Sequence, residues 1–264
     1  MNTKKIKLPS GVECIISELL GKHQRLLTQK NGEDVTGNFN EVLVSIIQEL
    51  GDIKSVALSD VQGMLAPDRK EVLVQARHLT MGKNEPFNFN FEYYNKIIGR
   101  KEKLALSYDF IESGDFPVTK VKKLDADGKV VIANYTKFSE IVKEFEIVLP
   151  RSKKLVSFTM LDGHGETIVA ETKKKNRDSH LPLRARKVKE IVVVDKQGKD
   201  KKPTKVNLNL DTLPLKDIAV LRNTIQELEG RVDTEIAFEH PETEEMTYQD
   251  ALGSLAFFFP SESI

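Results

Sequence analysis

The pattern of apolar and polar positions between residues 67 and 93 changes its period once. In the first part, apolar residues recur at the spacing of one helix face: Val72, Leu73, Ala76 and Leu79. This spacing predicts an amphipathic helix, with Pro67 at its start and Gly82 just after its end. Aromatic and polar residues then alternate up to residue 93, which predicts a half-buried strand with one aromatic face.

A second stretch, from residue 213 to residue 240, repeats this change of period. Its helix face is formed by Ile218, Leu221, Ile225 and Leu228. Asp68 matches Asp217 at a shift of 149 residues (217 − 68), and Gly230 follows the predicted helix. Upstream, LPSG matches LPRS at a shift of 141 residues, which also places His23 on His164. Because these anchors keep the same order, the sequence predicts a diverged tandem duplication.

The predicted fold class is α+β, with two diverged repeats of strands and amphipathic helices that each end in a helix–glycine–strand unit. We expect the N-terminal repeat at residues 1–95 and the C-terminal repeat at residues 148–264. Residues 96–147 have no counterpart in the duplication, and a bridging β-hairpin with Gly128 at its tip is predicted there. In the first repeat, a further helix is predicted from a cap at Asn38 to the apolar Leu50.

Composition restricts the classes of function. The 264 residues suffice for one large or two modest domains, and 40 basic and 40 acidic residues cancel, so no overall field attracts nucleic acid or a membrane. Cys14 is the only cysteine, which suits a protein assembled in a reducing cytoplasm. The N-terminus lacks the apolar run of a signal peptide, and no apolar stretch approaches the roughly 20 residues of a membrane span.

The sequence contains none of the common catalytic motifs, neither a nucleophile elbow, nor a phosphate-binding loop, nor a His-Glu-x-x-His zinc motif. His164 and Glu166 resemble an acid–base pair, so an enzyme with its site there is one hypothesis. His164 aligns with His23 at a predicted helix start, however, where an imidazole can cap backbone donors. We therefore expect no catalytic residue, metal, cofactor or small-molecule substrate. His240 is expected to be part-buried, and His78 to lie on the polar side of its helix.

Lysines gather between residues 173 and 205, in the clusters Lys173–Lys175 and Lys199–Lys205. Such clusters can bind phosphates, which makes a nucleic-acid-associated protein the alternative function. Proteins that bind nucleic acid usually add a basic overall charge and exposed aromatic residues. Here the charge is balanced and the aromatic residues lie on core-like faces, so solvated loops are favoured. Between the clusters, Glu190 to Asp195 predicts a strand, followed by a turn.

Apolar residues also gather near the C-terminus, where three consecutive phenylalanines must be buried, either in the chain's own core or by a partner. We expect this run and the two aromatic strands to provide contact surfaces. The candidate partner-binding residues are Phe257, Phe258, Phe259, Phe87, Phe89 and Phe91.

The order of these motifs resembles the T-even-like phage baseplate hub assembly chaperones and related baseplate proteins. The resemblance covers nearly the whole chain and lies in LPSG, LAPDRKEVLVQARHLTMG, LPRS with FTMLDGHGE, and IAFEHPETEEM before LAFFFP. It implies a non-enzymatic role through contacts with phage baseplate and tail hub proteins, in the host cytoplasm during assembly or in the baseplate of the finished virion. Members often carry a Cys-x-x-Cys pair after the aromatic strands, which suggests a zinc clip. The corresponding segments here contain no cysteine, so no metal residue is carried over.

Overall fold

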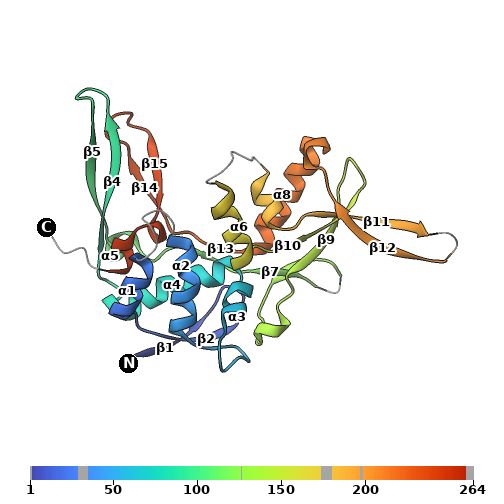
Figure 1. Cartoon of the computed structure of the whole chain (residues 1–264), viewed down its shortest axis with the longest axis horizontal. Coiled ribbons are helices and arrows are strands. Elements are labelled where there is room, and N and C mark those ends of the chain that lie inside the picture. The colour runs from blue at the N-terminus through green and yellow to red at the C-terminus, as the bar shows by residue number, and fades with distance from the viewer. Residues whose placement is uncertain (1, 29–34, 126, 174–179, 197–198, 260–264) are drawn as a thin grey trace.

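Helix α4 (Ala66–Met81) lies among the N-terminal elements and contacts elements from both halves of the chain (Figure 1). The computed structural model describes residues 2–28, 35–125, 127–173, 180–196 and 199–259. The fold is mixed α+β, with several small antiparallel sheets. Gly82 caps α4 with its N–H bonded to the His78 carbonyl at 3.0 Å, and its φ of +93° is one that glycine adopts most easily.

The N-terminal half builds a three-stranded sheet in the order β1-β2-β3. Its strands are β1 (Thr3–Lys7), β2 (Glu13–Ser17) and β3 (Ile47–Leu50). Its helices before α4 are α1 (Gly21–Thr28), α2 (Val35–Ile46) and α3 (Leu58–Gly63). The helix predicted to reach Leu50 is wrong in its last turn, because Ile47–Leu50 pairs with β2 as a strand.

The C-terminal half builds a four-stranded sheet in the order β12-β11-β10-β9. Its strands are β9 (Glu144–Val148), β10 (Leu155–Thr159), β11 (Lys189–Lys196) and β12 (Lys199–Asn207). Its helices are α6 (Gly163–Lys173), α7 (Leu181–Ala185) and α8 (Leu215–Glu229). Short 3-10 helices cover Phe138–Glu140, Leu210–Thr212 and Ala251–Gly253.

The two longest helices, α4 and α8, are each followed by a β-hairpin, and the two hairpins lie next to each other (Figure 1). The first hairpin pairs β4 (Phe87–Asn95) with β5 (Arg100–Tyr108), and the second pairs β14 (Glu235–Glu239) with β15 (Met246–Asp250). The helix–glycine–strand units therefore form as predicted. At the second one, Gly230 has φ +68°, and a Cβ there would lie 2.7 Å from the Thr119 carbonyl oxygen, so only glycine fits.

The two halves share an order of elements and one unusual contact. In each half, a strand pair precedes two helices, a third strand, a long helix and a hairpin. The Ser10 N–H donates to Asp68 Oδ1 at 2.9 Å, and the N–H groups of Arg151 and Ser152 donate to the Asp217 carboxylate at 2.8 Å each. The turns and aspartates that matched in sequence thus meet in the same way. The duplication itself stays a prediction, which these contacts support.

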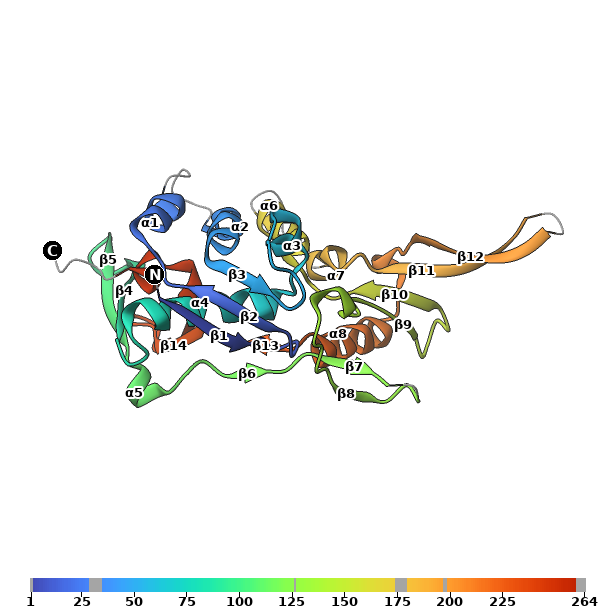
Figure 2. The ribbon, with the colours of Figure 1, turned by 90° about the horizontal axis from the view of Figure 1, so that it is seen from below.

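The segment predicted to bridge the two halves, residues 96–147, runs alongside elements of both halves (Figure 2). It contains the predicted hairpin, as β7 (Lys122–Leu124) paired with β8 (Val130–Ile132). However, the predicted boundary at residue 95 divides the β4–β5 hairpin, and the one at residue 148 falls within β9, before its last residue. The remaining elements are α5 (Phe110–Ser113), the pair β6 (Val118–Thr119) with β13 (Arg231–Val232), and α9 (Leu255–Phe258). Because α9 packs against β4 and α1, the end of the chain returns to the N-terminal half.

Candidate functional site

The polar side of α4 is buried as well as its apolar side, which corrects the amphipathic interpretation. Asp68, Arg69 and Arg77 are at most 3% exposed. Several of its charged residues join α4 to other parts of the chain. Besides the bond from Asp68 to Ser10, Arg69 Nε donates to Glu166 Oε2 at 2.7 Å, and Lys70 reaches Asp250 at 3.4 Å. The helix therefore acts as the structural centre that connects both halves.

The C-terminal phenylalanines belong to the chain's own core. Phe257 and Phe258 are 1% and 0% exposed. Arg77 Nε donates to the Phe257 carbonyl at 2.9 Å, and its guanidinium lies 5.2 Å from the centre of the Phe257 ring. Phe259 is half-buried against the same core. The expectation that this run forms a partner surface is therefore corrected for Phe257 and Phe258, since neither is accessible.

The aromatic strand β4 also faces inward. Phe87 and Phe89 are buried, and Phe91 is half-buried with its ring 4.9 Å from that of Phe238 on β14. Stacked and edge-on contacts at this separation are those that aromatic pairs prefer. The inner faces of the two hairpins thus form one small sandwich. Phe87, Phe89 and Phe91 hold the hairpins together. Phe87 and Phe89 are not accessible to a partner, which corrects the expectation for these two, whereas Phe91 is only half-buried.

The histidines serve the structure in different ways. His23 Nδ1 accepts the Leu20 N–H at 2.7 Å, and burial lowers the pKa of His23 to about 4. The capping role predicted for His164 is not confirmed, because Asp162 Oδ1 accepts the Gly165 N–H at the start of α6. His240 is half-buried, as expected, and accepts the Glu242 N–H at 3.2 Å. The expectation for His78 is wrong, because it is buried against Phe110, and burial lowers its pKa to about 4.

The acid–base hypothesis at His164 and Glu166 gains no support from their positions. His164 is exposed, whereas Glu166 turns toward Arg69. Burial raises the pKa of Glu166, although Arg69 opposes the shift. In the part of the chain that the structure describes, no hydrogen bond or ion pair joins the two residues. Cys14 is equally unsuited to act as a nucleophile, because burial raises the pKa of its thiol to about 12.

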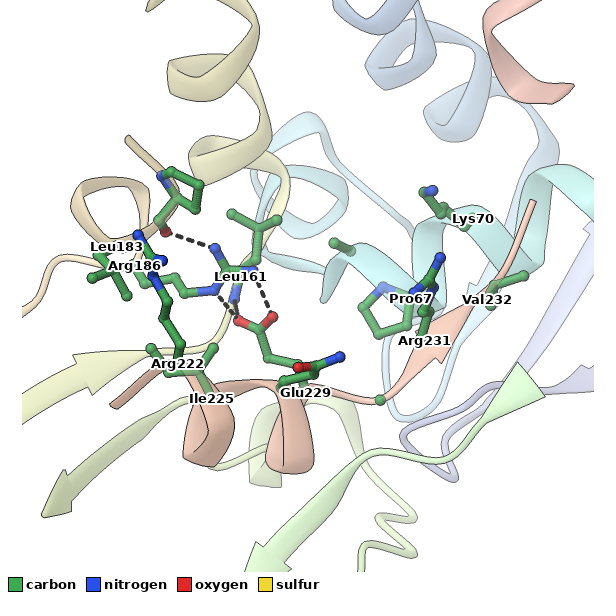
Figure 3. Close-up of a pocket in the computed structure, with 14 residues that line it drawn as sticks. Pro67, Lys70, Leu161, Leu183, Arg186, Arg222, Ile225, Glu229, Arg231 and Val232 are labelled. Carbon is green, nitrogen blue, oxygen red and sulfur yellow. Dashed lines mark hydrogen bonds and ion pairs between the residues drawn. The ribbon is translucent and has the colours of Figure 1, made fainter. Parts of the chain in front are cut away.

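A cavity of about 470 Å³ lies where the start of α4 meets α7, the end of α8 and β13 (Figure 3). At its wall, Arg186 and Glu229 form a two-pronged ion pair with both distances at 2.6 Å. Glu229 Oε1 also accepts the Leu161 N–H, and Arg186 Nη1 donates to the Pro182 carbonyl. A general acid or base must reach a proton of the substrate. This pair directs its hydrogen bonds to the protein instead, so it fastens α8 to α7 and β10.

One apolar strand with an exposed side chain lies outside the candidate residues. Beyond Glu190, β11 pairs only with β12, and this ribbon extends away from the body of the molecule (Figures 1 and 2). We call residues 189–207 the arm. Val193 on it is 62% exposed. The predicted strand is confirmed, whereas the turn after it and the Lys173–Lys175 cluster fall largely outside the described residues. The sequence signal for this surface is the run of apolar residues EIVVVD.

Within the described residues, no cluster of three or more His, Cys, Asp or Glu side chains is arranged to hold a metal ion. The helices in that part of the chain are also too short or too polar to cross a membrane. Comparison of the chain with models of known protein families, with curated proteins and with solved structures finds no match.

Proposed function

We propose that this protein is a phage tail baseplate hub protein or baseplate-assembly chaperone that acts through protein–protein contacts. The observation that carries the contact role is the arm, a two-stranded ribbon with apolar side chains on both faces. Ile191 and Val193 lie on one face and Val192 on the other, because successive residues of a strand point to opposite sides. The phage setting rests on the resemblance of the sequence motifs.

The arm lacks the cover that a ribbon with apolar residues on both faces usually has. An isolated two-stranded hairpin is at best marginally stable in water. A strand that is apolar on both faces is typical of strands that are covered on both sides. Ile191 and Val192 are half-buried and Val193 is exposed. Burying one valine side chain completely contributes on the order of 1.5 kcal/mol, so a partner that completes the cover of these three residues gains roughly 2 kcal/mol. These residues therefore suit a surface that is completed by another protein.

The test is co-purification with tail hub proteins from phage-producing cells, using the tagged full-length chain. We expect hub proteins to be recovered with the wild type and to be reduced strongly for Val193→Ser. The matched control is Ile111→Ser on α5, because Ile111 is 70% exposed but lies outside the arm. Failure of the wild type to recover any tail protein contradicts the phage setting. Equal recovery with both variants contradicts the role of the arm.

A nucleic-acid-associated role is the second candidate, and the charge of the arm is what favours it. Residues 189–207 contain six lysines and three acidic residues, a net charge of +3. The arm contains no aromatic residue on which bases can stack. Phosphate-driven binding weakens steeply with salt. Binding of DNA or RNA at about 50 mM salt that disappears as salt rises supports this role, and absence of binding at that salt removes it.

A further inference from the structure

Although the chain is neutral overall, two of its regions carry opposite net charges. The arm carries a net charge of +3. Residues 233–250, which include β14 and β15, contain seven acidic residues and no lysine or arginine, a net charge of −7. Figure 1 shows the arm at one end of the long axis and the β14–β15 hairpin toward the other. One molecule therefore cannot bring its own two charged regions together, whereas two molecules can.

The outer face of the β14–β15 hairpin has an apolar centre with an acidic border. Its inner face packs on β4–β5, so the alternate residues of both strands point outward. Tyr248 lies opposite Ala237, and Met246 lies opposite Glu239. Tyr248 and Met246 are 63% and 57% exposed. We call this surface the hairpin face, and its residues are Glu235, Ala237, Glu239, Met246, Tyr248 and Asp250.

One face of the arm has the same plan with the opposite charge. Val193 lies opposite Pro203, and Ile191 lies opposite Lys205, so apolar side chains occupy the centre and lysines the border. We call this surface the arm face, and its residues are Lys189, Ile191, Val193, Pro203, Lys205 and Asn207. Pro203 lacks the N–H that a further strand would need, which disfavours the addition of a strand along the edge of β12. The arm is thus suited to pack face to face.

We propose that the arm face of one molecule binds the hairpin face of a second copy, head to tail. This inference rests on the proposed function in taking the arm as a contact surface, and it names the partner. The apolar centres cover one another, while Lys189 and Lys205 approach Glu235 and Glu239. Within one molecule Lys205 pairs with Glu144 and Glu235 pairs with Arg231, so the contact exchanges these two surface pairs for new ones. No ion pair among the described residues involves Lys189 or Glu239, so their charges are available to a partner. Because the two faces differ, the contact is heterologous, and its repetition gives a ring or a filament.

The charges make the contact sensitive to salt, because interactions between exposed charges are screened beyond about 8–10 Å at physiological ionic strength. We expect sedimentation velocity of the full-length protein to show association that grows with protein concentration at about 50 mM salt. At about 500 mM salt the association should weaken by roughly tenfold or more. A protein that stays monomeric at the lower salt over a wide concentration range overturns the inference.

Reversed charges provide the decisive test. One variant reverses the arm face (Lys189→Glu with Lys205→Glu), and the other reverses the hairpin face (Glu235→Lys with Glu239→Lys). Each should weaken self-association by roughly tenfold or more. A mixture of the two should restore it, because each altered face again finds the opposite charge on the other variant. The exposed Lys120, outside both faces, provides the control Lys120→Glu, which should leave association unchanged.

The result that contradicts the inference is association that both reversals leave unchanged, or a mixture that stays monomeric. Circular dichroism checks the fold of each variant. If a reversed variant is unfolded, Tyr248→Ser and Val193→Ser take its place, and each must weaken association. A monomeric protein that still recovers tail hub proteins through Val193 removes the self-contact but not the proposed function. Self-association without any tail protein removes the phage setting alone.

Discussion

Replacing Asp68 by asparagine should make the stability of the protein less dependent on pH. Asp68 is 1% exposed, and burial raises its pKa to about 7 even though Ser10 donates to its carboxyl group. Its second oxygen, Oδ2, has no hydrogen-bond partner among the described residues. An asparagine can still accept the Ser10 N–H but never ionises. The two side chains are therefore nearly equivalent when Asp68 is protonated and differ when it is charged.

The magnitude follows from the two pKa values of Asp68. In the unfolded chain its pKa is about 3.9, whereas in the folded protein it is about 7. Between pH 5 and pH 8, unfolding therefore releases up to one proton, and the free energy of unfolding falls by as much as about 1.4 kcal/mol per pH unit, about 3 kcal/mol in all. The contribution of Asp68 to the free energy of unfolding is complete below the unfolded pKa and is lost as the pH rises through the folded pKa. Above about pH 8 it no longer changes.

Urea unfolding of both proteins from pH 5 to pH 8.5 measures this difference. We expect the advantage of Asp68→Asn over the wild type in the free energy of unfolding to grow by about 3 kcal/mol between pH 5 and pH 8, and the two proteins to match only below the unfolded pKa of about 3.9. Groups that titrate in both proteins cancel in the difference. A difference that stays constant across this range would refute the reasoning, because it would mean that Asp68 has the same pKa in the folded and unfolded states.

Asp217 is the matched control, with the opposite sign. Burial raises the pKa of Asp217, but the N–H groups of Arg151 and Ser152 outweigh burial, so that the pKa is lowered. Its contribution to stability is present above its unfolded pKa and is lost as the pH falls through the folded pKa. Asp217→Asn should therefore be less stable than the wild type near pH 7, and the deficit should shrink toward acid pH.

Other predictions concern the contacts that join distant parts of the chain. Glu229→Gln breaks the buried pair with Arg186 and should lower the free energy of unfolding by about 3 kcal/mol, whereas Glu140→Gln, in an exposed pair, should cost less than about 1 kcal/mol. Arg77→Leu removes the bonds to the carbonyls of Phe257 and Glu85, so limited proteolysis should release the C-terminal residues faster than from the wild type. Gly230→Ala should cost roughly 3 kcal/mol in thermal or urea unfolding, because of its positive φ and the Thr119 carbonyl. Gly82→Ala, with open space around it, should cost only about 1 kcal/mol.

The features that could be predicted from the sequence are those with a local cause. The change from helical to alternating spacing locates α4 and β4, and again α8 and β14, because side-chain direction follows the local backbone. Glycine marks the ends of α4 and α8, because the residue after each helix has a positive φ, which glycine adopts most easily. Ile47–Leu50, predicted as helix and found as strand β3, shows where local patterns fail. A short apolar run suits a buried helix and a buried strand equally. Only its pairing with β2 decides between them.

The polar contacts of α4 have causes that no local pattern contains. Asp68, Arg69 and Arg77 look solvent-facing on a helix that is apolar on one side. Their partners are 58, 97 and 180 residues away along the chain. A buried charge is tolerated only where such a partner exists. The sequence shows which residues are charged, but whether they are buried depends on how the end of the chain returns to α4.

The phenylalanines and the valines of the arm also differ in a way that no local pattern shows, which is whether distant parts of the chain cover them. Alternation or an apolar run shows that a strand needs cover, and it does not show whether the cover comes from the same molecule. For Phe257 and Phe87 the structure supplies it internally, with their rings 5.4 Å apart. For Val193 it does not, although EIVVVD is as apolar as a core strand. A core-like sequence in an exposed position is therefore stronger evidence for a binding surface than an aromatic run that the fold already covers.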